Sequence, residues 1–181
     1  NIDMEDNPTC LANFILIKRN IDSNFTGHTE YLQKLDNKKY ANMIMIHDKI
    51  IISTITTHLQ LSYVSNYIKN KNFLKNQIFN LYKTLKSDFN IKNPKLIISG
   101  INPHAGENGE IGKEEVKYIK PIIKNLKKEN IDISGPYPAD SMLIKESMKY
   151  YDCYIFMFHD QALIPFKFIS KFSGVNYTGN L

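Results

Sequence analysis

Three histidines follow stretches of sequence that are typical of buried strands. His58 closes the run KIIISTITTH, His104 follows KLIISGI, and His159 follows CYIFMF. Neutral imidazoles delivered by different loops are common ligands of divalent metals, and such a site can keep an open position for a substrate. A single histidine is more often an ordinary surface or core residue. Three at equivalent positions favour a site for Zn²⁺ or another divalent ion.

The stretch NPHAGENGEIG, residues 102–112, is a long loop with three glycines spaced by three. Glycine lets the backbone approach a ligand closely, and a helix that begins after such a loop can hold an anion. The loop is not a phosphate-binding P-loop, because Glu107 stands where that motif needs glycine and Glu114 where it needs Ser or Thr. No G-x-G-x-x-G follows a predicted strand either. A plain strand-to-helix connection remains the alternative.

Three further motifs carry groups that could bind a substrate. GPYPAD is a rigid turn that delivers Asp140 near a predicted helix start, either as its N-cap or as a ligand for a substrate amine or hydroxyl. HDQALIPFK sets Lys167 close to His159, where it could hold a phosphate or simply be solvated. GHTE offers His28 and Thr29 after a glycine, although Thr29 could instead cap a helix.

The elements that must position these residues alternate between strands and helices. The apolar pattern predicts strands over 43–47 and 49–58, a helix over 72–89, a strand over 95–101, a helix through 119–126, a strand over 131–133, a helix over 139–150 and a strand over 153–158. The first two strands suggest a hairpin. The alternation predicts a layered α/β fold with a mostly parallel sheet. Ligands of such sheets bind at the carboxyl ends of the strands, where the three histidines fall.

Composition limits the class of protein. The chain has 181 residues, enough for one domain or one and a fragment. Its net charge of +5 invites a nucleic-acid partner, but of 23 basic residues only Arg19 is arginine, and the lysines are scattered as on solvated helix faces. Cys10 and Cys153 form no C-x-x-C pair, which favours a reducing cytosol.

Neither a membrane span nor a signal peptide is expected. No uncharged apolar run reaches the roughly 18 residues that a span requires. The N-terminal segment NIDMEDNPTC is acidic and polar. We therefore expect a cytoplasmic protein without a membrane partner.

Five motifs, in this order and spacing, closely resemble the 4-hydroxythreonine-4-phosphate dehydrogenase family of pyridoxal phosphate biosynthesis: GHTEYL, TTHLQL, SGINPHAGENGEIGKEE, GPYPAD and FHDQALIPFK. The resemblance covers roughly residues 15–181. It implies a three-layer α/β/α sandwich like that of isocitrate and isopropylmalate dehydrogenases, which bind NAD without a Rossmann motif. It also implies that residues 1–181 are the substrate-binding, metal-binding and dimerisation portion of a two-domain enzyme. The family's N-terminal G-D-P-x-G-I-G segment and the segment beyond VNYTGNL are not found here.

The resemblance also implies a set of site residues. A divalent ion (Zn, Mg or Co) would be bound by His58, His104 and His159, with ligands shared across a homodimer. Substrate contacts would come from His28, Thr29, Asp140, Lys167 and Asn176. Lys167 and Asp140 are the candidates for moving the proton, and the residues that bind NAD or NADP are not identified.

The implied reaction is the oxidation of 4-phosphooxy-L-threonine by NAD or NADP, followed by decarboxylation to 3-amino-2-oxopropyl phosphate. The metal would lower the pKa of the reacting hydroxyl and polarise the resulting ketone. Two alternatives stay open: a related dehydrogenase of threonate or erythronate 4-phosphate, and, for this chain alone, a catalytically incomplete domain that binds metal and dimerises. We expect the isolated chain to be inactive. A nucleic-acid-binding module is the third interpretation.

Overall fold

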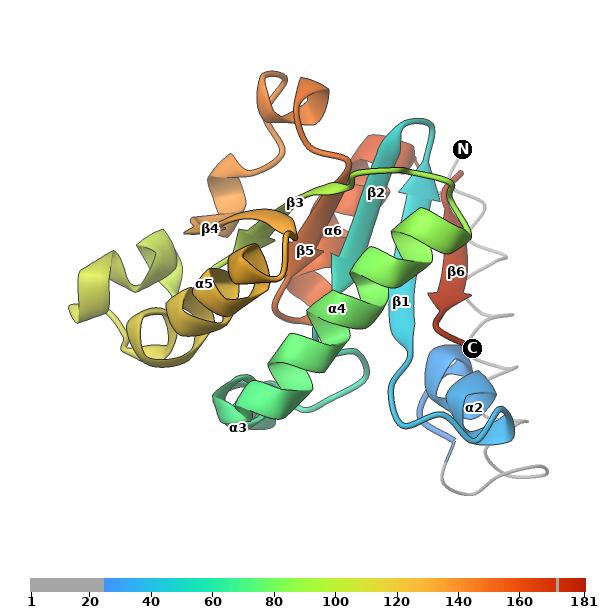
Figure 1. The fold of residues 1–181 in the computed structure, drawn as a ribbon, viewed down its shortest axis with the longest axis horizontal. Helices are drawn as coiled ribbons and strands as arrows, with labels where there is room; N and C mark the ends of the chain where they lie inside the picture. The colour runs from blue at the N-terminus through green and yellow to red at the C-terminus, as the bar shows by residue number, and fades with distance from the viewer. Residues whose placement is uncertain (1–24, 172) are drawn as a thin grey trace.

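The computed structural model describes residues 25–171 and 173–181, which form a sheet with helices on both faces (Figure 1). Cys10, Arg19 and the acidic N-terminal segment lie outside the described residues. The elements are α2 (His28–Leu35), β1 (Asn42–His47), β2 (Ile50–Thr54), α3 (Leu61–Lys69), α4 (Lys71–Ser87), β3 (Lys95–Ser99), α5 (Lys120–Lys128), β4 (Asp132–Tyr137), β5 (Cys153–Phe156), α6 (His159–Ser170) and β6 (Val175–Gly179). Among them, no helix is long and apolar enough to cross a membrane.

The sheet has six strands in the order β4-β3-β5-β2-β1-β6. The first four are parallel to one another, as expected for strands joined by helical crossovers. Strands β1 and β2 form the predicted antiparallel hairpin, and β6 adds an antiparallel edge on β1. The four parallel strands therefore place their carboxyl ends along one edge of the sheet.

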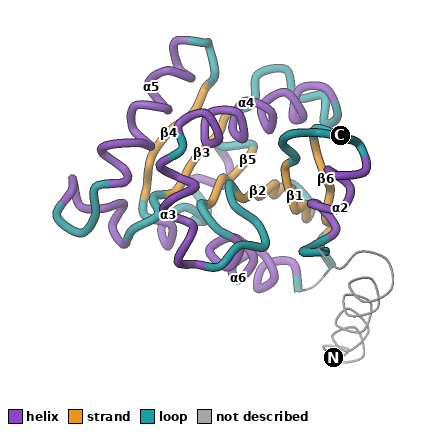
Figure 2. Tube along the Cα trace, turned by 90° about the horizontal axis from the view of Figure 1, so that it is seen from below, coloured by secondary structure: helices purple, strands orange, loops and turns teal. Residues whose placement is uncertain are grey.

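Two apolar cores lie on opposite faces of this sheet. Helices α3, α4 and α5 pack on one face and α6 packs on the other (Figures 1 and 2). Successive strand residues point to opposite faces, so Ile98 and Ile155 enter the first core while Ile97 and Tyr154 enter the second. The predicted three-layer α/β/α sandwich is confirmed.

The predicted helix over residues 139–150 is wrong. This segment contains only the short 3₁₀ turns Ala139–Ser141 and Ser147–Lys149. The Ser147 hydroxyl donates to the carbonyl oxygens of Met142 and Ile144, so a side chain takes up acceptors that a helix would use. The buried Met142 is held by the second core instead.

Other predicted elements differ from the structure mainly at their ends. The strand predicted over 49–58 ends at Thr54, so His58 lies beyond it. The helix predicted through 119–126 begins as a π-helical turn, Glu115–Ile119, and Pro121 sits in the first turn of α5, where a missing N–H is tolerated. Helices α2, α3 and α6 and strand β6 were not predicted.

Candidate functional site

Candidate residues follow four neighbouring strands at the carboxyl edge of the sheet. In sheet order, β4 leads to Asp140, β3 to His104, β5 to His159 and β2 to His58. Ligand sites of open α/β sheets occur at this edge, because loops from several strands converge there. The fold thus gathers four of the candidates from segments up to about a hundred residues apart.

The His58 and His159 rings lie side by side, with centroids 5.3 Å apart. Each ring also has a carboxylate partner. His58 Nδ1 is 2.9 Å from Glu30 Oε2, and His159 Nδ1 is 2.7 Å from Asp160 Oδ1. An ionised carboxylate can only accept, so each Nδ1 donates its hydrogen to the carboxylate, and in the neutral ring each Nε2 presents a lone pair. Imidazoles oriented in this way are typical of metal ligands.

The carboxylate of Glu30 is held in its ionised form. Burial raises its pKa, but the hydrogen bonds from His58 and Thr57 and the charge of His58 outweigh burial and lower the pKa from 4.5 to about 2. The same hydrogen bond to Glu30 raises the pKa of His58, against the opposing effect of burial. Glu30 therefore remains an acceptor for His58 throughout the physiological pH range.

His104 does not join this pair within the chain. It is exposed, on the segment Pro103–Gly109, in which residues 104–108 all have positive φ and are not helical. Within residues 25–171 and 173–181, no group of three or more His, Cys, Asp or Glu side chains could hold a metal ion. The structure thus brings together two of the three predicted ligands, His58 and His159, and leaves His104 apart.

The start of the His104 loop is fixed by a fully buried carboxylate, Glu115. Its Oε1 accepts from the backbone N–H groups of Ile101 and Asn102, both at 2.8 Å, and its Oε2 accepts from Asn102 Nδ2 at 3.0 Å. Glu115 belongs to the π-helical turn that follows the loop. The loop is therefore anchored by the segment at its own far end.

A second side chain, Gln161, joins the ends of β3 and β5. Its Nε2 donates to the Gly100 carbonyl at 3.0 Å, and its Oε1 accepts from Met157 N–H at 2.8 Å and from the Ser99 hydroxyl at 3.0 Å. The path of the chain toward His104 is thereby tied to the strand end that precedes α6. Sequence reasoning missed this role.

Glu30, Glu115 and Gln161 were all missed as candidates. Each lies inside a motif that the sequence does mark, namely GHTE, GKEE and HDQ. The only feature of the sequence that could have pointed to these three residues is that they lie in the same motifs as the candidate histidines or next to them. Most of the atoms they bind belong to residues 13 to 62 positions away, and spacing in the sequence does not reveal such contacts.

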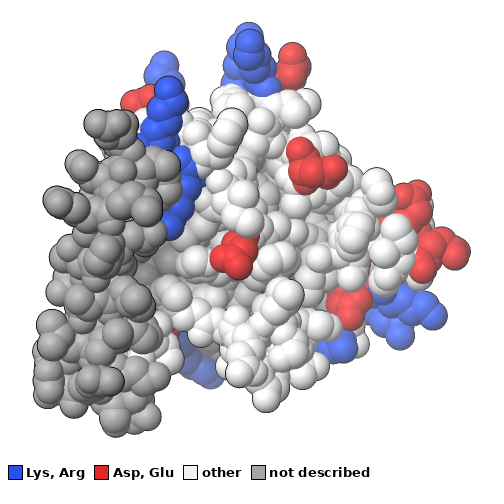
Figure 3. Space-filling view, turned by 180° about the vertical axis from the view of Figure 1, so that it is seen from behind, with Lys and Arg blue, Asp and Glu red and all other residues white. Residues whose placement is uncertain are grey.

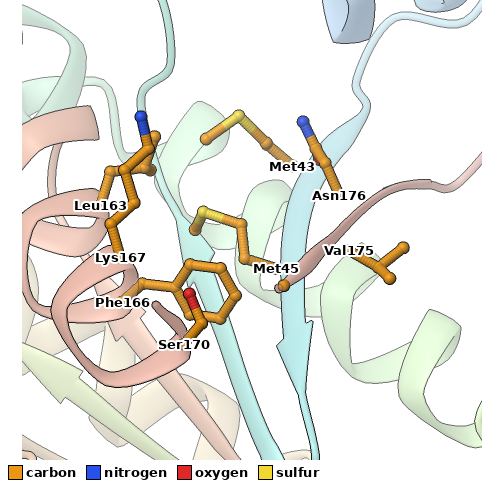
Figure 4. Close-up of a pocket in the computed structure, with 9 residues that line it drawn as sticks. Met43, Met45, Leu163, Phe166, Lys167, Ser170, Val175 and Asn176 are labelled. Atoms are coloured by element: carbon orange, nitrogen blue, oxygen red, sulfur yellow. The ribbon is translucent and has the colours of Figure 1, made fainter. Parts of the chain in front are cut away.

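Lys167 and Asn176 line one cavity of about 260 Å³ between α6, β1 and β6. Its walls are apolar, with Met43 and Phe166 among them, and both nitrogen-bearing side chains extend toward the same end of the cavity (Figure 4). The predicted proximity of Lys167 to His159 is wrong. Lys167 follows His159 by eight positions on α6, about 12 Å along the helix axis.

The GHTE motif does not form the side-chain cap that was the alternative role of Thr29. Helix α2 begins at His28 with Gly27 as its N-cap. Thr29 lies inside the first turn, is buried, and has its Oγ1 3.5 Å from Thr178 Oγ1 of β6. The exposed His28 ring packs edge-on against Phe25, with centroids 5.5 Å apart.

Two observations complete the surroundings of the site. Asp140 is exposed in the turn Ala139–Ser141, which lies against the His104 loop; it caps no helix, because none follows.

A second cavity, of about 490 Å³, opens beside His58 and is lined by Thr29 and Glu30 together with aromatic side chains such as Tyr67.

The three-layer sheet and the residues at its carboxyl edge define an α/β protein with a ligand site at the strand ends. The family described as "Pyridoxal phosphate biosynthetic protein PdxA" matches residues 16–181. The chain belongs to this family, which confirms the resemblance seen in its motifs.

Individual relatives agree with this assignment. A 4-hydroxythreonine-4-phosphate dehydrogenase of Neisseria meningitidis serogroup A is 38% identical over 154 residues, covering 85% of this chain and 46% of the relative. The crystal structure of the Klebsiella pneumoniae enzyme of that name superposes with a TM-score of 0.77 at 30% identity, covering 87% of this chain and 48% of that one. The Burkholderia phymatum enzyme gives 0.77 at 32% identity, with 87% and 47% covered. The chain thus spans about half the length of the relatives it matches.

Proposed function

We propose that the protein oxidises 4-phosphooxy-L-threonine with NAD or NADP, followed by decarboxylation to 3-amino-2-oxopropyl phosphate, in the cytoplasm. Family membership supports this reaction, and the observation that carries it is the pair of imidazoles at the carboxyl edge, each oriented by a carboxylate. The buried free thiol of Cys153 is compatible with a reducing compartment.

His58 and His159 would hold the divalent ion through Nε2, with His104 as the third ligand. Zn²⁺, Mg²⁺ and Co²⁺ are the candidates, and imidazole donors favour Zn²⁺ and Co²⁺ among them. The bound ion would supply the Lewis acid that lowers the pKa of the reacting hydroxyl. Since His104 stands apart in one chain, we propose that the ligand set is completed across a homodimer.

The remaining polar residues would bind the substrate. The Lys167 ammonium suits a phosphate or carboxylate end, and Asn176 can donate to the same group from the opposite wall of the cavity. His28 and Thr29 would contact the substrate from the start of α2. Lys167 and Asp140 remain the candidates for moving the proton.

The homodimer is supported by an exposed apolar surface on α6. Ile164 is 71% exposed and Phe168 is 84% exposed, one helical turn apart. Figure 3 views the molecule from the side of α6, and the centre of this face carries few charged side chains. Helix α6 begins at His159, so a subunit docked here would lie next to the candidate site.

Two measurements test the proposal. The full-length protein should reduce NAD or NADP when given 4-phosphooxy-L-threonine, and threonate and erythronate 4-phosphates serve as the competing substrates. Turnover of only the competing substrates would contradict the proposal, as would turnover of none.

A His104→Ala change should abolish stoichiometric binding of Zn²⁺, measured by calorimetry. His47→Ala is the matched control, because His47 ends β1 away from the carboxyl edge and contacts Ser173 instead. Unchanged Zn²⁺ binding by the His104 variant would remove this residue from the site.

A further inference from the structure

We propose that Glu30 is a positioning residue, which fixes the tautomer and the orientation of His58 so that Nε2 faces the metal. This inference rests on the proposed function and deepens it. Glu30 belongs to the GHTE motif, whose histidine and threonine are the residues expected to contact the substrate. The role of the motif's glutamate and glycine is not explained by substrate contacts.

Both carboxylate oxygens of Glu30 are used by consecutive residues of the loop after β2. Oε1 accepts from the Thr57 hydroxyl, and Oε2 accepts from His58 Nδ1 at 2.9 Å. A carboxylate held at both oxygens cannot rotate without losing one of these bonds. The imidazole is therefore fixed in orientation as well as in tautomer.

The pair is partly shielded from water, which strengthens the hydrogen bond. The side chains of His58 and Glu30 are 35% and 28% exposed. Two neutral tautomers of a histidine exchange freely unless a partner selects one, and the acceptor at Nδ1 selects the form with its lone pair on Nε2. That lone pair is the donor which a metal next to His159 requires.

Gly27 gives an independent sign that the pair is built into the fold. A Cβ on Gly27 would lie 2.2 Å from His58 Nδ1 and 2.5 Å from Glu30 Oε2. The φ of Gly27 is 178°, an extended backbone open to any residue, so glycine is needed here for space and not for conformation. The pair thus lies directly on the backbone of the motif that contains Glu30.

The same short helix reaches two parts of the site. Thr29, next to Glu30 in α2, contacts Thr178 of β6, while Glu30 contacts the loop after β2. Helix α2 is therefore held between the sheet edge and the His58 loop. A change at Glu30 should disturb His58 first, because the Thr29 contact does not depend on it.

The first test measures the tautomer without any metal. Long-range proton–nitrogen NMR spectra of ¹⁵N-histidine-labelled protein, at a pH where the rings are neutral, report which nitrogen of each ring is protonated. We expect the Nδ1–H form for His58 in the unaltered protein and a mixture, or the Nε2–H form, in Glu30→Gln. The His159 signals should keep the Nδ1–H form, since Asp160 is unchanged.

The second test measures Zn²⁺ affinity in the full-length protein. Glu30→Gln should weaken binding about 10- to 100-fold, the usual effect of losing a carboxylate partner of a metal-bound histidine. Gly27→Ala should act in the same direction, by displacing the pair without removing the carboxylate. Glu146→Gln is the matched control, because Glu146 is exposed and is not the carboxylate partner of either His58 or His159; this variant should bind Zn²⁺ as the unaltered protein does.

The outcomes separate this inference from the proposed function. An unchanged His58 tautomer in Glu30→Gln overturns the inference, and so does a changed tautomer with unchanged Zn²⁺ affinity. If Glu30→Gln does not fold, Gly27→Ala carries the same two measurements. Failure of the unaltered protein to bind Zn²⁺ would contradict the proposed function, whereas the metal-free spectra test the Glu30–His58 bond by themselves.

Discussion

At the residue scale, the candidate site depends on carboxylates with two different kinds of partner. Glu30 is bound by an imidazole and a hydroxyl, whereas Glu115 is bound by backbone N–H groups and an amide. The Glu30 pairing orients His58, a candidate metal ligand, and makes stability depend on pH. The Glu115 pairing satisfies buried N–H donors and fixes the path of a loop, so its loss should lower the free energy of unfolding.

The pKa shifts of Glu30 and His58 predict the pH range in which this pair contributes most to the free energy of unfolding. The pKa of Glu30 falls from 4.5 to about 2 on folding, so its contribution is present above pH 4.5 and is lost as the pH falls toward 2. The pKa of His58 is raised, so its contribution is complete below 6.5 and is lost as the pH rises through the raised value. The pair should therefore stabilise most between pH 4.5 and 6.5.

Urea denaturation across this range checks the prediction. Glu30→Gln should reduce the free energy of unfolding by on the order of 2 kcal/mol near pH 5.5, and by less near pH 2. If the free energies of unfolding of the unaltered protein and of Glu30→Gln differed by the same amount at every pH, the assigned Glu30–His58 interaction would be contradicted.

Removal of the Glu115 carboxylate should destabilise the protein. In Glu115→Ala, the N–H groups of Ile101 and Asn102 lose their acceptor in a buried place, and we expect a loss of about 3 kcal/mol in the free energy of unfolding. Glu110→Ala is the control, since Glu110 is exposed in the same loop and should change stability by less than about 0.5 kcal/mol. Equal effects of the two changes would argue against the anchoring role.

At the element scale, the segment Pro103–Gly109 matters most, because it carries His104 on a run of left-handed residues. Such a conformation costs non-glycine residues about 1–2 kcal/mol each and persists only where the surroundings enforce it. Glu115 and Gln161 supply that enforcement at the start of the loop. The loop is therefore a positioned element and not a plain connection between β3 and α5.

Two glycines of this loop allow packing to be separated from backbone strain. Both have positive φ, but a Cβ on Gly106 would lie 2.5 Å from Glu115 Oε2, whereas on Gly109 it would meet only Lys113 Cγ at 3.9 Å. Gly106→Ala should thus lower the free energy of unfolding by at least about 1 kcal/mol more than Gly109→Ala. Denaturant midpoints compare them directly, and a larger effect of Gly109→Ala would refute the contact-based explanation.

At the scale of the whole molecule, the described surface is consistent with the proposed homodimer. The basic residues are nearly all lysines, and among the described residues Figure 3 shows no continuous basic patch on the α6 side. The exposed Ile164 and Phe168 on that side suit a hydrophobic interface instead. Completion of the proposed three-histidine set across two subunits would then couple assembly to metal binding.

Changes to the α6 surface test this coupling. Phe168→Asp in the full-length protein should shift the dimer toward monomer in sedimentation equilibrium and weaken Zn²⁺ binding at least tenfold, because a buried charge disfavours an apolar interface. Tyr150→Asp is the control and should remain dimeric: Tyr150 is 57% exposed and lies against Lys95 at the start of β3, at the opposite edge of the sheet from the histidines. A Phe168→Asp protein that stays fully dimeric would place the interface elsewhere.

The sequence by itself predicted strands β1 to β5 and helices α4 and α5, because apolar periodicity and the alternation of β and α segments are local properties. It did not predict α2, α3, α6 or β6. The motifs likewise identified the family and placed His58, His104 and His159 after strands. The helix predicted over residues 139–150 does not form, because local hydrogen bonds of Ser147 compete with it.

Only the tertiary structure decided which side chains meet. Strand order makes β2 and β5 neighbours, and this brings His58 to His159 while leaving His104 apart. It also gives Glu30 a partner 28 residues away and separates Lys167 from His159 along one helix. These contacts depend on long-range packing of the sheet. A local pattern in the sequence therefore cannot predict which two side chains meet.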